Sequence, residues 1–102
     1  MDWYSVRCVF RDRNSARLLE ERITLWRASS FDDAVERAER EAKEYARALN
    51  LRYLELAQAF KLSQELSDGA EMFSLMRESD LPDEAYLTTF FDTGTERQQH
   101  SK

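Results

Sequence analysis

The chain opens with two stretches in which apolar and polar residues alternate. Across residues 3–13 one face of the pattern holds Tyr4, Val6, Cys8 and Phe10, and the other holds Trp3, Ser5, Arg7, Val9 and Arg11. A period of two, with aromatic and β-branched residues, is typical of a strand with one buried face. The alternation resumes over residues 18–28 after the turn formers of residues 12–15. The two stretches predict an antiparallel hairpin.

A long helix is predicted over residues 31–49. A serine at its cap can accept a backbone N–H, and Asp32 and Asp33 lie where the positive end of the helix dipole stabilises acids. Apolar residues follow at helical spacing and form one stripe: Phe31, Ala34, Val35, Ala38, Ala42, Tyr45, Ala46 and Leu49. Asn50 is a suitable terminator.

Residues 51–66 alternate again, and two structures compete for them. A helix is one, because leucine, alanine, glutamine and glutamate are good helix formers. Asp68 and Gly69 favour strands, since Asp-Gly between two alternating runs is a strong hairpin signal. We therefore predict strands over residues 52–65 and 71–78.

The predicted fold is α+β: a four-stranded antiparallel sheet, in the order β-β-α-β-β, packed against one long helix. A short C-terminal helix is predicted to begin near Pro82, because proline suits the first turn of a helix. A chain of 102 residues is the size of one domain. We expect residues 3–94 to form that domain and residues 95–102 to be a flexible polar tail.

Both faces of this predicted sheet carry large apolar residues, although one helix covers only one face. The residues expected to face the helix are Tyr4, Val6, Phe10, Ile23 and Leu25; those expected to point the other way are Trp3, Val9 and Trp26. Exposed apolar patches of this kind mark interfaces with a second copy or another protein. The alternative is that the C-terminal segment folds over them as ordinary core.

Two acidic residues beside turns, Glu71 and Glu96, are further candidates for protein contacts, because function tends to concentrate near loops. Simple solvation is the alternative explanation for both, since charged side chains normally lie outside. The predicted protein-binding residues are thus Trp3, Val9, Trp26, Glu71 and Glu96.

The net charge of −5 and the pI of about 4.9 argue against nucleic-acid and anionic-lipid partners, and suit either simple solubility or a basic protein partner. No apolar run approaches the ~20 residues of a membrane span, and no signal-peptide pattern is visible. Cys8 is the only cysteine and lies in an apolar alternation, which fits a buried thiol in a reducing compartment. We expect a cytoplasmic protein.

Groups suited to catalysis are sparse. His100 is the only histidine, so no nucleophile–histidine pair can be built from the predicted domain. Zinc-type clusters and glycine-rich phosphate loops are missing from the sequence. The adjacent acids each have a structural explanation: Glu20 and Glu21 point to opposite faces of a strand, and the other pairs lie at predicted helix starts. We expect no enzyme activity, no cofactor and no metal.

Several segments together resemble a small bacterial family, the domain of unknown function 4288. They are Trp3-Tyr4-Ser5-Val6, Glu21-Arg22-Ile23, Phe31-Asp32-Asp33-Ala34, Gly69-Ala70-Glu71-Met72-Phe73-Ser74, Tyr86-Leu87 and Asp92-Thr93-Gly94-Thr95-Glu96-Arg97. The resemblance implies a short, single-domain bacterial protein with the β-β-α-β-β layout. It implies no activity and no site residues.

The leading functional hypothesis is a non-catalytic protein-binding domain, of an immunity or regulatory type, acting through its sheet face and acidic surface. Its partner would be another protein or a second copy in a homodimer. The alternative is a small-molecule-binding dimer with a pocket between sheet and helix, lined by Trp26 or Tyr53.

Overall fold

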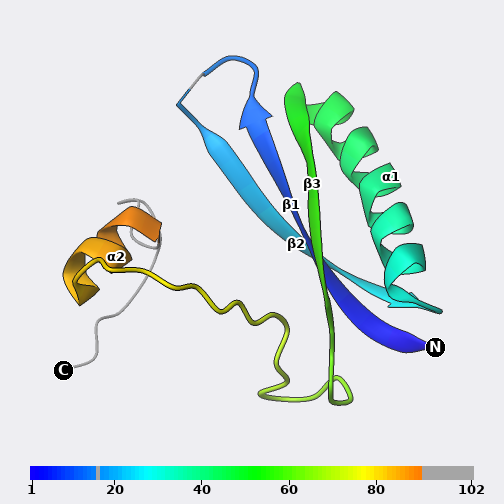
Figure 1. Cartoon of the computed structure of the whole chain (residues 1–102). Helices are drawn as coiled ribbons and strands as arrows, with labels where there is room; N and C mark the ends of the chain where they lie inside the picture. Colours follow the sequence, from blue (N-terminus) through cyan, green and yellow to red (C-terminus); the bar gives the residue numbers. More distant parts are fainter. Residues whose placement is uncertain (16, 91–102) are drawn as a thin grey trace.

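The computed structural model describes residues 1–15 and 17–90, which form a three-stranded antiparallel sheet and two helices (Figure 1). In chain order these elements are β1 (Asp2–Asp12), β2 (Leu19–Ala28), α1 (Phe31–Leu49), β3 (Leu51–Lys61) and α2 (Asp83–Phe90). The fold is α+β. The N-terminal hairpin, the long helix, a strand after it and the short helix are confirmed, but the sheet has three strands instead of the predicted four.

β1 is the central strand, in the order β2-β1-β3, and both neighbours run antiparallel to it. Its alternating apolar residues Tyr4, Val6, Cys8 and Phe10 are all buried on the face that α1 covers. The period of two therefore identified this face correctly. We call the opposite side of the sheet the second face.

α1 begins and ends where the capping signals place it. The Ser30 side chain accepts a hydrogen bond from the Asp33 N–H at 3.0 Å, and Asn50 ends the helix in the left-handed conformation with φ 56°. The Asp33 carboxylate accepts from the backbone N–H of Ser29 at 3.0 Å, which lowers the pKa of Asp33. The buried stripe consists of Ala34, Ala38, Ala42 and Ala46. These small side chains let α1 lie close to the sheet.

The predicted strand over residues 71–78 is wrong. Gly69, with φ 81°, makes the expected turn, and the Ala70 N–H donates to the Ser67 carbonyl at 3.0 Å. After the turn the chain does not pair with β3; it crosses the second face, where the Ser5 hydroxyl donates to the Met72 carbonyl and Phe73 packs against Phe60. These contacts replace a strand ladder. We call residues 62–90, which include α2, the arm.

The predicted orientation of β2 is also wrong. Trp26 pairs with Tyr4 across the hairpin and so faces α1, whereas Ile23 and Leu25 lie on the second face. The sequence argument gave the helix side to the more apolar set of alternating residues. The other set, which includes Arg22, Thr24 and Trp26, faces α1 instead, because its polar atoms find partners on that side. Arg22 forms two hydrogen bonds with Glu41, and the Trp26 indole N–H donates to Thr24 Oγ1 at 2.7 Å.

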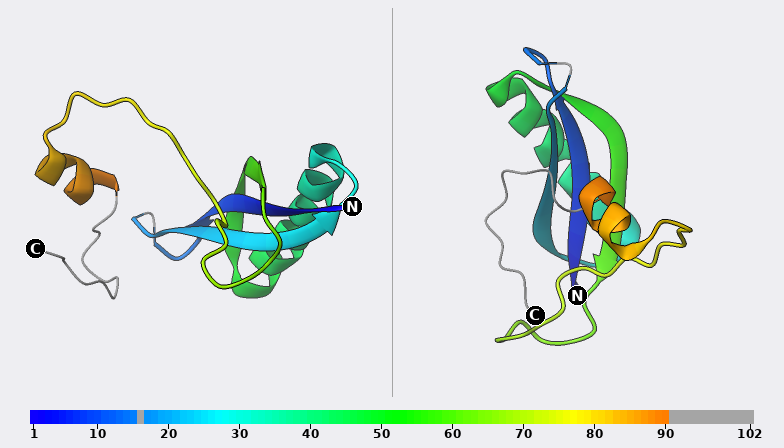
Figure 2. Two further views of the ribbon diagram at one scale, coloured as in Figure 1. Left: turned by 90° about the horizontal axis from the view of Figure 1, so that it is seen from below. Right: turned by 90° about the vertical axis from the view of Figure 1, so that its left-hand side faces the viewer.

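The arm is joined to the sheet by few contacts, and none of its α2 residues is buried. Figure 1 shows α2 standing off from the sheet, and the right-hand view of Figure 2 shows α2 in front of the sheet with α1 behind it. The stability of the fold should therefore come from the packing of the sheet against α1.

This division of stability between the sheet–α1 core and the arm can be tested by replacing two phenylalanines. Phe10 is fully buried and packs edge-on against Tyr45, with ring centroids 5.3 Å apart. Phe10→Ala should lower the free energy of unfolding by roughly 3–5 kcal/mol, because it empties a filled core position. Phe90→Ala, at a position 44% exposed on α2, should change it by less than about 0.5 kcal/mol. Urea unfolding followed by circular dichroism measures both, and equal losses would contradict the division.

Candidate functional site

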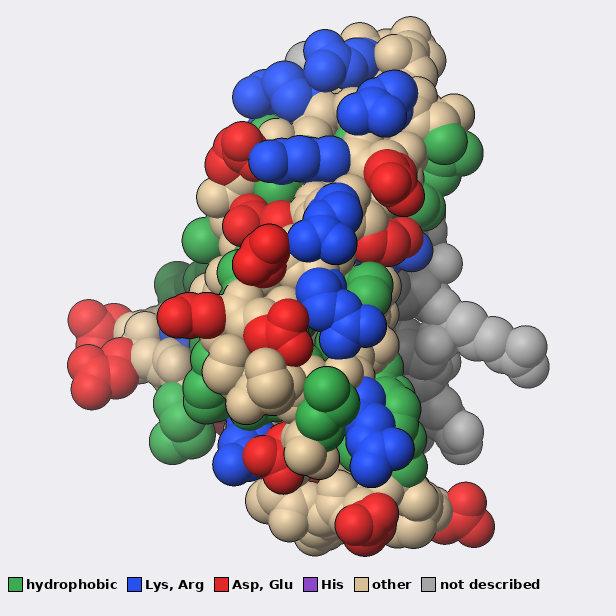
Figure 3. All heavy atoms as spheres, turned by 90° about the vertical axis from the view of Figure 1, so that its right-hand side faces the viewer, with side chains coloured by type: hydrophobic (Ala, Val, Ile, Leu, Met, Phe, Trp, Pro, Cys, Tyr) green, Lys and Arg blue, Asp and Glu red, His purple; other side chains and the backbone are tan. Residues whose placement is uncertain are grey.

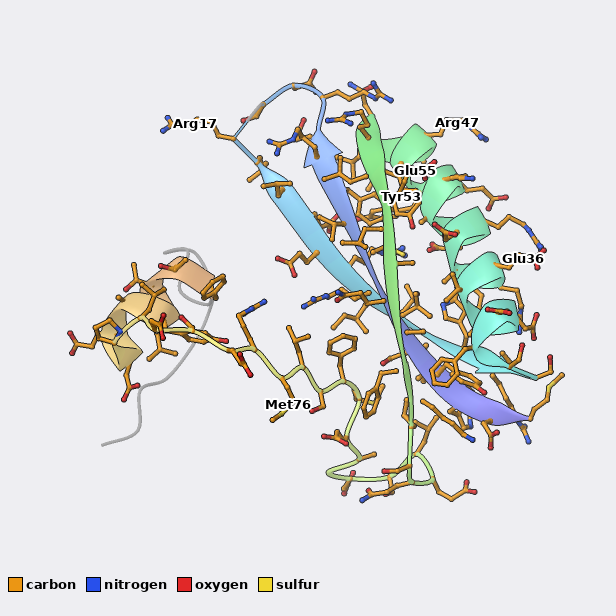
Figure 4. All side chains as sticks on the ribbon, viewed as in Figure 1. Arg17, Glu36, Arg47, Tyr53, Glu55 and Met76 are labelled. Carbon is orange, nitrogen blue, oxygen red and sulfur yellow. The ribbon has the colours of Figure 1, made fainter. Side chains whose placement is uncertain are left out.

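A groove opens at the end of the molecule where β1 ends, α1 ends and β3 begins. Its volume is about 450 Å³. The cations around it are Arg13, Lys43, Arg47 and Arg52, and the rest of the lining is Ala46, Asn50, Leu51, Tyr53 and Glu55. We call it the basic groove. Figure 3 shows Lys and Arg side chains gathered at this upper end, and Figure 4 shows Arg47, Tyr53 and Glu55 near one another there.

Two left-handed residues shape the basic groove. Asn50 reverses the chain between α1 and β3 within one residue, and its N–H donates to the Ala46 carbonyl. Glu55, with φ 61°, lies in the irregular part of β3, where the register with β1 shifts between Cys8 and Phe10. A positive φ costs most side chains free energy, but asparagine tolerates it, so the small cost lies mainly at Glu55.

The charged side chains around the basic groove are mostly positive. Within the described part of the chain, none of the side chains of Lys43, Arg47 and Arg52 is in an ion pair. Arg13 donates from Nε to the Leu51 carbonyl at 3.3 Å, which holds its guanidinium near the rim. Four cations face one carboxylate, that of Glu55, in a chain whose net charge is −5. Such a concave positive region attracts anions.

The groove floor rests on a buried tyrosine. The Tyr53 hydroxyl donates to Glu39 Oε2 at 2.6 Å, and burial, followed by this hydrogen bond, raises the pKa of Tyr53. Burial also raises the pKa of the Cys8 thiol beneath it. Both groups therefore stay protonated near neutral pH. The floor can pack against a ligand, but the Tyr53 proton is already donated to Glu39, and neither group is a nucleophile in its reactive form.

A second hollow lies between the second face and the arm. Its volume is about 410 Å³. Its lining consists of Arg7, Glu21, Phe73, Leu75, Arg77, Tyr86, Thr89 and Phe90. The Arg7 guanidinium lies 5.0 Å from the Phe73 ring centroid and 3.4 Å from Glu21, while Arg77 lies 4.2 Å from the Phe90 ring centroid. Arginine and aromatic groups of this kind are enriched in protein interfaces.

The negative charge of the chain is concentrated in the arm. Residues 62–90 carry seven acidic side chains and one basic one, whereas residues 1–61 carry 12 basic and 11 acidic ones. The arm also exposes large apolar side chains: Leu66, Met72, Leu75, Met76, Leu81, Leu87 and Phe90. In Figure 4, Met76 points away from the arm's ribbon, and it is 93% exposed. The body of the protein is close to neutral, and the arm is acidic and apolar.

The residues predicted to bind protein do not form one patch. Trp3 and Val9 lie half-buried on the second face of β1, as expected. Trp26 is half-buried on the opposite side, with Arg37 lying 5.4 Å from its ring centroid. Glu71 is exposed on the arm, whereas Glu96 lies outside the described residues.

Sequence reasoning missed the basic groove entirely. Its cations come from three separate segments, and only the antiparallel pairing of β1 with β3 brings Arg13 beside Arg52. One feature of the sequence could have indicated the groove: Arg47 and Arg52 flank the helix terminator Asn50. The average acidity of the chain hid this local excess of positive charge.

The fold and its surfaces define a small α+β protein with a helix-covered sheet, an acidic arm and a basic groove. The model of the family described as "Domain of unknown function (DUF4288)" matches residues 3–74, and the chain belongs to this family. No curated protein and no solved structure matches the chain. Among residues 1–15 and 17–90, no helix is long and apolar enough to cross a membrane, and no three metal-ligating side chains cluster.

The Tyr53 hydroxyl should leave a signature in the pH dependence of stability. Above pH ~10 the unfolded chain releases this proton while the folded protein keeps it, so the free energy of unfolding should fall as the pH rises further. Tyr53→Phe should cost about 1 kcal/mol near neutral pH, through the lost hydrogen bond. It should also make the decline above pH 10 shallower. Urea unfolding at pH 7, 10 and 11 measures both effects, and an unchanged alkaline slope would contradict the assignment.

Proposed function

We propose that this chain is a non-catalytic protein-binding protein that contacts a basic protein partner through its arm and second face. The observation that carries the proposal is the composition of the arm: exposed apolar side chains interspersed with seven acids and one base. Apolar groups supply binding energy when they leave water, and the acids select a positively charged partner and speed the encounter.

The way the arm is attached supports this role. Its contacts with the sheet centre on Met72 and Phe73, and within the described residues no side chain of α2 is fully buried. Apolar residues exposed on a helix are costly unless something covers them, and interaction surfaces are the usual reason for their presence. The half-buried Trp3 and Val9 extend the same side of the molecule onto the sheet.

The finer proposal is an immunity or regulatory protein of the bacterial cytoplasm. A small acidic chain that masks a basic surface on an enzyme or toxin would need no catalytic group of its own. The partner of an immunity protein is encoded beside it, so the neighbouring gene supplies the candidate for a direct test.

Retention of a partner on the immobilised chain tests the proposal with two charge-matched variants. Glu71→Gln with Glu78→Gln removes two acids from the arm; Glu36→Gln with Glu44→Gln removes two from the outer face of α1. The arm variant should bind the retained protein about tenfold more weakly at low salt, and the α1 variant should bind it as the wild type does. Failure to retain any protein from the native host, or equal retention by the arm variant, would contradict the proposal.

The basic groove favours a second candidate function, the binding of a small anionic molecule. Arg47 and Arg52 project from two different elements toward one concave space floored by Tyr53. Guanidinium groups suit carboxylate and phosphate ligands because they donate two parallel hydrogen bonds. This site lies at the end of the molecule where β1 and α1 end and β3 begins.

Titration calorimetry with inorganic phosphate and with citrate tests this second function. Arg52→Gln should weaken binding about tenfold, because one charge-assisted pair is lost. Arg40→Gln is the matched control, since Arg40 lies on the outer face of α1 and pairs with Glu36 at 3.1 Å. Absence of heat with both ligands, or equal weakening by the control, would remove the candidate.

A further inference from the structure

The sheet has two outer strands, and they differ in how their free edges are protected. β3 carries the register shift and the left-handed Glu55, and α1 packs chiefly against it. Irregularities of this kind prevent another strand from pairing with an edge. β2 runs over ten residues with no register irregularity against β1 and contains neither proline nor glycine. β2 therefore presents the regular edge.

The hydrogen bonds of the hairpin fix which residues of β2 face outward. The Asp12 N–H donates to the Leu18 carbonyl at 3.0 Å, so even-numbered residues of β2 direct their backbone groups toward β1. The odd-numbered residues Glu21, Ile23, Leu25 and Arg27 then direct theirs toward the free edge. In the described part of the chain, no backbone–backbone hydrogen bond is made to these outward groups. An incoming antiparallel strand would bond to them.

We propose that two copies of this chain pair through β2, antiparallel and two-fold symmetric, with Thr24 opposite Thr24 of the second copy. The two sheets then become one continuous sheet with β2 and its symmetry mate at the centre. Both α1 helices lie on the same face, away from the junction, because α1 packs chiefly against β3. The symmetry makes the interface isologous, so one strand must complement itself.

β2 does complement itself in this register. Glu21 meets Arg27 of the second copy and Ile23 meets Leu25, and symmetry repeats each pair. Opposite charges and branched apolar pairs are the cross-strand neighbours that stabilise a sheet. In this register the residues whose backbone groups point to the free edge lie opposite one another. Their backbones can therefore form hydrogen bonds while their side chains form the favourable pairs.

The two neighbouring registers do not share this match. Moving the second strand by two residues in one direction keeps the backbone pattern but places Glu21 opposite Leu25 and Arg27 opposite Leu19. Moving it by two residues in the other direction places Arg27 opposite Ile23 and Glu21 opposite Ser29, beyond the end of β2. Both shifts lose the ion pairs. A shift by one residue is excluded, because it would pair outward groups with inward ones.

Two existing contacts lie at the ends of the proposed junction. Arg7 Nη1 lies 3.4 Å from Glu21 Oε1, but this carboxylate is 62% exposed and has a second oxygen for Arg27 of the other copy. The Arg27 carbonyl already accepts a hydrogen bond from Arg37 Nη1 at 2.7 Å. A carbonyl oxygen has two lone pairs, so it can accept the strand partner as well. The central pairs of Ile23 with Leu25 are free of such competition.

Pairing would also change the second face. Ile23 is 49% exposed in the single chain, and Leu25 is half-buried beside it. In the dimer these residues from both copies form one apolar cluster on the symmetry axis, bordered at both ends by the Glu21–Arg27 pairs. The dimer does not require the proposed partner, because its hydrogen bonds come from the strand edge and none of its residues belongs to the arm. Its side chains Glu21, Ile23 and Leu25 lie on the second face, so the partner would meet the paired sheet.

Charge reversal tests the register directly. Glu21→Arg and Arg27→Glu should each weaken the dimer about tenfold or more, because like charges then face each other twice. An equimolar mixture of the two variants should recover wild-type association as a heterodimer, since each reversed charge meets an opposite one. Sedimentation equilibrium over a concentration series measures all three samples.

Two controls separate pairing from net charge and from misfolding. Glu44→Arg changes the charge equally on α1 and should leave association unchanged. Ile23→Pro removes an outward N–H without touching the β1 ladder, and should abolish the dimer while circular dichroism still shows the native spectrum. A wild type that stays monomeric at every concentration, a dimer indifferent to both reversals, or a mixture that fails to recover would each overturn the proposal.

Discussion

The packing of the buried face of β1 against the alanine stripe of α1 is the interaction on which the other features depend. Because Ala34, Ala38, Ala42 and Ala46 have small side chains, the helix lies close enough for Phe10 and its neighbours to fill the space between the layers. That close approach is centred on β1 and β3. It leaves β2 as the exposed edge of the sheet, and it leaves the second face without a helix of its own.

The sequence patterns of β1 and α1 were sufficient to predict the two surfaces that pack together in this interaction. The period of two in β1 and the alanine spacing of α1 each have one explanation, since both faces are set by burial. The faces of β2 were not predictable in the same way. One of its two alternating sets of residues is the more apolar, yet that set lies on the second face, because the orientation was decided by partners on another element, such as Glu41 for Arg22. Such partners have no signature in the strand itself.

The missing fourth strand has a similar cause. Asp68 and Gly69 make the predicted turn, but a turn fixes only the local direction of the chain. Pairing beyond it requires a regular edge, and β3 is irregular around Glu55. The chain instead satisfies the buried Ser5 hydroxyl with the Met72 carbonyl and stacks Phe73 beside Phe60. Neither contact could be read from spacing, because the partners are far apart in sequence.

The separation of charge follows from the same geometry. Once the arm cannot join the sheet, its acids and apolar side chains remain outside the core, while the ends of β1, α1 and β3 converge their arginines at the groove. Because the arm and the groove lie on different elements, a basic protein and a small anion would not compete for one surface. The β2 edge is a third surface, which borders the second face through Glu21, Ile23 and Leu25. A dimer formed there would present two arms to one partner, and the second arm would then bind at a high effective concentration. Weak contacts by a single arm would therefore suffice for firm binding.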